Sequence, residues 1–79
     1  MNYDLAMMAL DGLKRSPITI RIEGGNVHIE GEHAGFKDLA RLFLLLGGSE
    51  SADAEDGIEL QPGVHLTADS PALTMRLTG

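Results

Sequence analysis

The sequence contains no cysteine among its 79 residues. Disulfides therefore cannot support the fold, and thiolate nucleophiles, redox pairs and cysteine-ligated zinc sites are excluded. A chain of this length forms one domain, residues 1–79, and buries only about 60% of the surface that its unfolded state exposes. Packing or self-association must therefore stabilise a thin core.

Basic residues are also scarce, with six Lys and Arg against twelve Asp and Glu and a net charge of −6. Such a chain is repelled by phosphate backbones and anionic lipid and is attracted to basic surfaces. We therefore expect no nucleic-acid ligand and no membrane partner. The apolar fraction of 43% is typical of a folded domain rather than of a disordered acidic tail.

Long apolar runs are absent as well. The run of leucine and phenylalanine from Leu42 to Leu46 is about a quarter of the length that a bilayer span requires. The N-terminal apolar stretch, Leu5 to Leu10, lies between Asp4 and Asp11, which does not fit a signal peptide. These features predict a cytoplasmic protein.

Two segments have the periodicity of helices. Residues 1–16 have a candidate cap at Asn2 and a stop at Pro17, although Gly12 and the short length leave a loosely docked or disordered N-terminus as the alternative. Residues 34–46 form the second helix, which Gly47 ends. Its predicted core face is Phe36, Leu39, Ala40 and Phe43, with Lys37, Asp38 and Arg41 opposite.

The first strand pair is predicted from residue 18 to residue 30, where apolar and polar residues alternate around Gly24 and Gly25. Side chains of alternating residues point to opposite faces of a strand. The predicted inner face is Ile18, Ile20, Ile22, Val27 and Ile29. The outer face is Thr19, Arg21, Glu23, His28 and Glu30.

The last third of the chain begins with a small, acidic stretch, residues 48–57, that predicts a solvated loop. A third strand is expected to start near Gly63, and residues 73–78 alternate as the fourth. The whole pattern is a leading helix followed by ββαββ. The fold class is therefore α+β, a small two-layer sandwich of one antiparallel sheet with the helices on one face.

No arrangement of residues indicates catalysis. His28 and His65, with Glu30, would make half a metal site if their strands were neighbours, but no HxH or HExxH spacing supports one. We therefore expect solvated histidines, no metal and no cofactor. The serines lie in turns or loops without a GxSxG elbow, and carboxylates in a flexible loop are poor catalysts, so no enzyme is expected.

The charge distribution is more informative, because the 34 residues between Arg41 and Arg76 contain neither Lys nor Arg. This acidic surface either maintains solubility or meets a basic partner. The candidate partner-binding residues are Glu50, Asp53, Glu55, Asp56 and Glu59. The alternative site is the open face of the sheet, around Arg21, His28, Glu30, His65 and Arg76.

Two stretches of sequence carry short family motifs. Residues 29–46, IEGEHAGFKDLARLFLLL, combine a strand ending in glycine with a Gly-Phe/Leu-x-x-Leu-Ala-x-x-Leu helix, and residues 64–77, VHLTADSPALTMRL, add His-Leu and Ser-Pro-x-Leu strands. In these features, which cover about two thirds of its length, the chain resembles the immunity protein 32 family of bacterial polymorphic toxin systems. The matching residues are Gly35, Phe36, Leu39, Ala40, Leu42, His65, Leu66, Ser70, Pro71 and Leu73.

The resemblance implies a small cytoplasmic antidote that binds a cognate toxin without performing chemistry. The acidic surface would suit a basic toxin, such as a nuclease whose own active site attracts nucleic acid. The competing function is a homodimeric structural or regulatory module with no toxin partner. In that case Leu42 and Leu45, at the end of the second helix, are the expected dimer contact.

Overall fold

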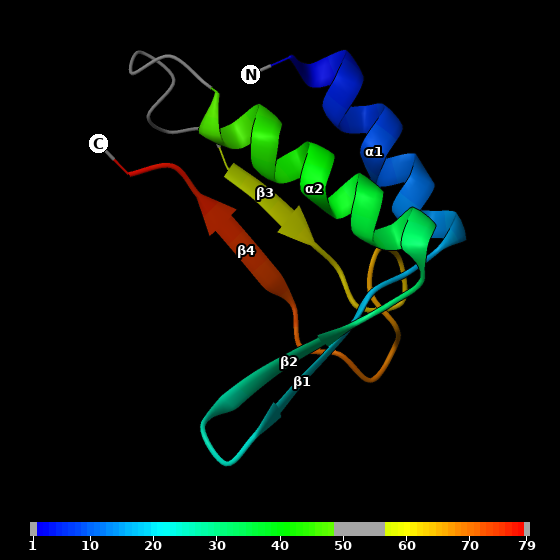
Figure 1. Ribbon diagram of the computed structural model, residues 1–79, viewed down its shortest axis with the longest axis vertical. Coiled ribbons are helices and arrows are strands. Elements are labelled where there is room, and N and C mark those ends of the chain that lie inside the picture. The colour runs from blue at the N-terminus through cyan, green and yellow to red at the C-terminus, as the bar shows by residue number, and fades with distance from the viewer. Residues whose placement is uncertain (1, 49–56, 79) are drawn as a thin grey trace.

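A computed structural model describes residues 2–48 and 57–78 of the chain. Its elements follow the order α1 (Tyr3–Arg15), β1 (Thr19–Glu23), β2 (Asn26–Glu30), α2 (His33–Gly47), β3 (Gly57–Leu60) and β4 (Leu73–Arg76). The helices lie side by side, α2 packs on β3, and the β1–β2 hairpin extends away from both helices (Figure 1). The predicted α+β fold with a leading helix is confirmed.

The first helix, α1, is capped at both ends. Asn2 Oδ1 accepts a hydrogen bond from the Leu5 N–H at 3.2 Å, as the sequence predicted for this cap. Asp4 in the first turn and Lys14 and Arg15 in the last turn complement the helix dipole. The helix packs against α2, and its buried residues are Ala6, Ala9, Gly12 and Leu13.

The buried face of α2 is rotated from the predicted one. Phe36, Ala40 and Phe43 are exposed, and only Leu39 of the predicted face is buried. The reason is the position of α1, whose Gly12 allows the Asp38 carboxyl group to lie at the contact between the helices, with 13% of its side chain exposed. The buried residues of α2 are Gly35, Leu39, Leu42 and Leu46.

The four strands form two separate two-stranded antiparallel sheets rather than the single sheet expected. The β1–β2 hairpin has the predicted register, with Ile22 opposite Val27 and Glu23 opposite Asn26. In the second pair, β4 meets β3, so the third strand is Gly57–Leu60 and does not start near Gly63.

Residues 61–66 form a turn instead of that third strand. The Gln61 carbonyl accepts hydrogen bonds from the N–H groups of Val64, His65 and Leu66. Gly63 has a φ of 80°, a conformation that favours glycine. The turn lies beside Ile18, whose N–H donates to the His65 carbonyl at 3.2 Å and whose carbonyl accepts from the Thr67 N–H at 3.0 Å. These two bonds join the start of the first hairpin to the turn that follows β3.

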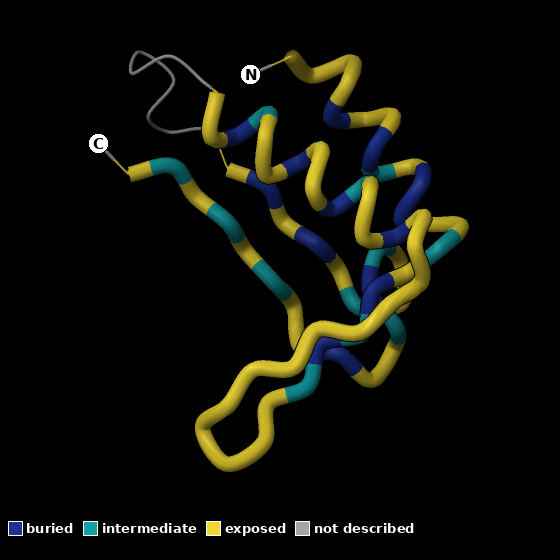
Figure 2. The backbone as a smooth tube through the Cα atoms, viewed as in Figure 1, coloured by how far each residue is buried: buried dark blue, intermediate teal, exposed yellow. Residues whose placement is uncertain are grey.

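The hydrophobic core lies between the two helices, β3 and the base of the first hairpin. Its largest fully buried side chains are Leu13, Ile18, Leu42, Leu60 and Leu66. Ile20 is also buried, but the hairpin extends past the core and is exposed from Ile22 to Glu30 (Figure 2). No helix in the described part of the chain is long and apolar enough to cross a membrane.

Candidate interaction surface

The polar face of the first hairpin carries a small ion-pair network. Arg21 Nε donates to Glu30 Oε1 at 2.8 Å, and its Nη1 is paired with Glu23. His28 Nε2 lies 4.0 Å from Glu23 Oε2. The hydrogen bond and charge of Arg21 lower the pKa of Glu30, but 57% of the Glu30 side chain is exposed, so the pairing stabilises the fold little.

The other two residues of the predicted sheet-face site lie elsewhere. His65 belongs to the turn after β3, where its Nδ1 accepts a hydrogen bond from the Gln61 N–H at 3.2 Å. Arg76 is on β4, in the other sheet. Arg21, His28, Glu30, His65 and Arg76 therefore do not lie on the open face of one sheet, as the sequence predicted, because the strands form two sheets.

The two histidines considered as metal ligands lie in different elements. His28 is on β2, and His65 is in the turn after β3. The described residues contain no group of three or more side chains that could hold a metal ion. Partial burial, followed by the charge of Lys14, lowers the pKa of His65, and Asp11 acts in the opposite direction.

Most of the predicted acidic site, Glu50, Asp53, Glu55 and Asp56, lies outside the described residues. Glu59 is on β3, where it is exposed and opposite Thr74 of β4. The described residues have eight acidic and six basic side chains, so most of the excess negative charge belongs to residues 50–56.

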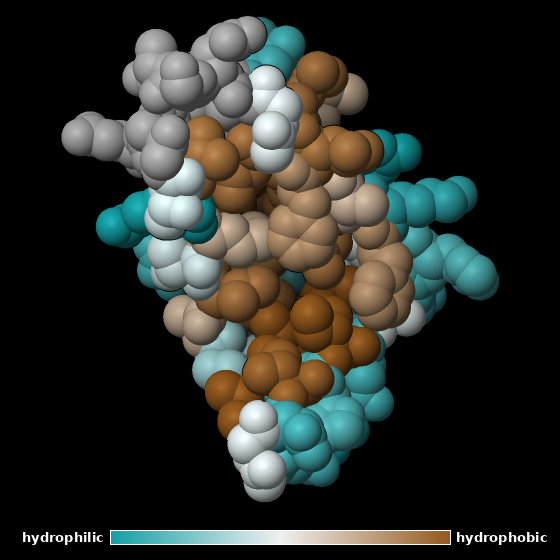
Figure 3. All heavy atoms as spheres, turned by 60° about the vertical axis from the view of Figure 1, so that its left-hand side comes forward, coloured by the Kyte–Doolittle hydropathy of each residue, from teal (hydrophilic) through white to brown (hydrophobic). Residues whose placement is uncertain are grey.

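The apolar side of the first hairpin is largely exposed. Ile22, Val27 and Ile29, which we call the hairpin face, are exposed to between 43% and 64%. The register places Ile22 opposite Val27 and Ile29 opposite the buried Ile20, so all four side chains share one side of the hairpin. Figure 3 shows apolar side chains continuing from the hairpin over the middle of this view.

The sequence correctly predicted that these side chains share one side, but it predicted a buried face. The helices and β3 cover only the base of the hairpin, at Ile18 and Ile20. The alternating pattern could not predict this exposure. It determines the side of the strand to which each side chain points, but not how far along the hairpin the helices and β3 extend.

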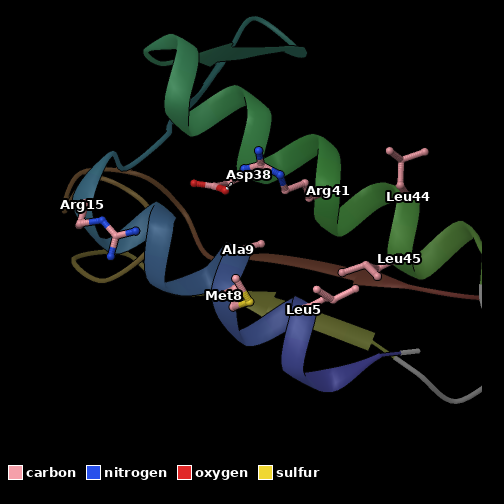
Figure 4. A pocket seen from close by; sticks show the side chains of 8 residues that line it. All are labelled: Leu5, Met8, Ala9, Arg15, Asp38, Arg41, Leu44 and Leu45. Atoms are coloured by element: carbon pink, nitrogen blue, oxygen red, sulfur yellow. Dashed lines mark hydrogen bonds and ion pairs between the residues drawn. The ribbon is translucent and has the colours of Figure 1, made fainter.

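A groove of about 530 Å³ lies between α1 and α2. Leu5, Met8, Ala9, Leu44 and Leu45 form its apolar lining. Asp38 and Arg41 lie on α2 across from Met8 and Ala9, and Arg15 lies at the end away from Leu44 and Leu45 (Figure 4). Arg41 Nη1 donates to Asp38 Oδ1 at 2.6 Å, which neutralises much of the charge there. Leu45 is half-buried beside this groove, whereas Leu42, the other predicted dimer contact, is fully buried and cannot meet a partner.

Comparisons with protein-family models, with curated proteins and with solved structures find no match. The argument for function therefore depends on the residues and surfaces of this chain. Its described surface carries exposed apolar side chains on both helices and on the first hairpin.

Proposed function

We propose that this protein is a non-catalytic protein-binding domain and that the hairpin face is its recognition surface. The observation that supports the proposal is the exposure of Ile22, Val27 and Ile29 on a strand pair that extends beyond the core. Exposed apolar surface is costly for a protein whose core is thin, and contiguous apolar patches usually mark interaction sites. Interface energy is concentrated in such centrally placed, desolvated side chains.

The partner we propose is a basic toxin domain, for which this chain is the immunity-type antidote. The net charge of −6 supports a basic partner, because opposite charges raise the association rate. The motifs of residues 29–46 and 64–77 support the immunity type through their resemblance to that family. We also propose a cytoplasmic location, because the resemblance implies a cytoplasmic antidote.

The first experiment measures affinity for the product of the adjacent reading frame by calorimetry. The double variant Ile22→Thr/Val27→Thr should bind about 10- to 100-fold more weakly, because it removes apolar contact while keeping β-branched side chains. Val64→Thr is the matched control, since Val64 is also an exposed valine but lies outside the hairpin. Equal affinity for all three proteins would exclude the hairpin face.

A second experiment tests the charge of the partner. Reversing Asp53, Glu55 and Asp56 to lysine should slow association, and association of the wild-type protein should slow as salt rises. An association rate that does not respond to ionic strength would contradict a basic partner while leaving the hairpin face untouched.

A further inference from the structure

The outer edge of β2 is an open strand edge. Within the described residues β2 pairs only with β1, and all five of its residues are exposed. Native edge strands are usually blocked by Lys, Pro or a bulge, because an open edge invites pairing with another chain. The β2 sequence, NVHIE, contains neither Lys nor Pro, and its register with β1 is continuous.

The opposite edge of the hairpin is occupied. Along β1 and the residue before it, the Ile18 N–H and carbonyl are bonded to His65 and Thr67, and the Ile20 N–H donates to Ser70 Oγ. The β1 edge is therefore blocked at the base of the hairpin, whereas no strand of the described residues lies along the outer edge of β2.

The backbone groups on that edge follow from the turn. Glu23 and Asn26 close a two-residue turn of Gly24 and Gly25, both with positive φ, which makes them a hydrogen-bonded pair. Hydrogen-bonded and non-hydrogen-bonded pairs alternate along an antiparallel ladder. Val27 and Ile29 consequently direct their N–H and C=O groups outward, away from β1.

We propose that two copies of this chain pair antiparallel through β2, about a two-fold axis at His28. This register pairs all five residues of each β2. It sets Val27 opposite the partner subunit's Ile29, so both outward-facing residues gain hydrogen-bond partners and apolar neighbours. His28 meets its own copy, and Glu30, which has the only carboxyl group in β2, meets the partner subunit's Asn26 rather than a like charge.

A second copy of the chain fits this edge, because the sequence of β2 is complementary to itself when Val27 lies opposite the partner subunit's Ile29. One surface used twice gives a closed dimer. The product is a four-stranded sheet, which is more stable than an isolated hairpin, and it joins two hairpin faces into one apolar surface. The pairing uses the strand edge and not the face, so it is independent of the proposed toxin partner.

The first test is sedimentation velocity of the full chain, without any partner, from about 1 μM to about 1 mM, where small interfaces associate. We expect the mass to rise from 8.4 kDa toward twice that value. A chain that stays monomeric to the highest concentration overturns the proposal, whether or not it binds a toxin.

The register is tested with single cysteines, because the chain has none of its own. In the proposed dimer, position 28 meets itself as a non-hydrogen-bonded pair with a Cα separation of about 4.5 Å, within disulfide range. His28→Cys should therefore form a covalent dimer under mild oxidation. Asn26→Cys or Glu30→Cys alone should not, whereas an equimolar mixture of those two variants should form the mixed dimer.

Circular dichroism of the reduced variants keeps the test interpretable if one of them does not fold. His28, Asn26 and Glu30 are all exposed, so each reduced variant should retain the wild-type spectrum. Similar cross-linking at all three single positions would show random collision and would overturn the register.

Discussion

Ser70 Oγ accepts a hydrogen bond from the Ile20 N–H at 2.9 Å, across 50 residues of sequence. Both residues are buried, and in the part of the chain that the structure describes no strand pairs with β1 on this side. The hydroxyl group therefore takes the place of a strand carbonyl and satisfies a buried donor. It ties the base of the first hairpin to the segment that joins β3 and β4.

Removing this hydroxyl should destabilise the fold. Ser70→Ala leaves the Ile20 N–H buried without its acceptor, which should lower the free energy of unfolding by about 1–3 kcal/mol. Urea denaturation followed by circular dichroism measures the change. Thr74→Ala, at an exposed position of β4, is the control and should cost less than about 0.5 kcal/mol. Similar losses for the two variants would contradict a structural role for Ser70.

The contact between the helices at Gly12 gives a second prediction. A Cβ at position 12 would lie 2.6 Å from Asp38 Cγ, so Gly12→Ala must displace a carboxyl group that is bonded to Arg41. We expect Gly12→Ala to destabilise the wild-type protein. In an Asp38→Ala background it should stabilise by up to about 1 kcal/mol, the ordinary helix preference of alanine over glycine.

The four proteins of that double-mutant cycle should show a coupling energy of at least about 1 kcal/mol by urea denaturation. Gly47→Ala is the control for helix propensity, because a Cβ there meets no neighbouring atom within the described residues. Additive effects of the two substitutions would mean that Gly12 is not needed for helix packing.

The stability of the protein should depend on pH through His65. Its folded pKa lies below the ordinary value of 6.5, so the unfolded chain binds the proton more readily. The stability that follows from this difference is fully present above pH 6.5 and is lost as the pH falls through the folded pKa. Urea denaturation at about pH 7.5 and about pH 5.5 should show a smaller loss for His65→Asn than for the wild-type protein.

Asparagine is chosen because its side-chain oxygen can accept the hydrogen bond that His65 Nδ1 receives from the Gln61 N–H. This keeps the turn intact while removing the titrating group. If the variant loses as much stability as the wild-type protein over the same interval, the pH dependence comes from other groups.

Two isoleucines on the same side of β1 should differ in their effect on stability. Ile20 is 4% exposed and Ile22 is 62% exposed. Ile20→Ala should lower the free energy of unfolding by about 2–4 kcal/mol, and Ile22→Ala by less than about 1 kcal/mol. Thermal and urea denaturation test this difference. An equal cost would mean that the hairpin face is covered in the folded chain and is not available to a partner.

Local sequence signals predicted the elements well. The Asn2 cap, the glycine turn of the first hairpin and the stop at Gly47 each depend on chemistry within a few residues, and each lies where it was expected or within a residue of it. The third strand was misplaced because Val64 and Leu66 alternate like a strand, although the Gln61 carbonyl bonds that segment into a turn.

Which side chains are buried and which are exposed depends on contacts between residues far apart in the sequence. Which side of α2 is buried is set by α1 at Gly12, and which isoleucines are buried is set by how far the helices reach along the hairpin. Ser70 belongs to the Ser-Pro-x-Leu motif, but only its bond to Ile20 shows why that serine is buried. The sequence thus identified the apolar side of the hairpin and could not show that most of it is exposed.

The central claim, that the hairpin face recognises a protein partner, is tested most directly by titrating the isotope-labelled protein with the product of the adjacent reading frame. Amide chemical shifts report which residues meet the partner. We predict that the largest changes fall on Ile22, Val27 and Ile29, with small changes along the groove at Met8 and Leu44. Changes confined to the groove, with the hairpin amides unmoved, would contradict the account.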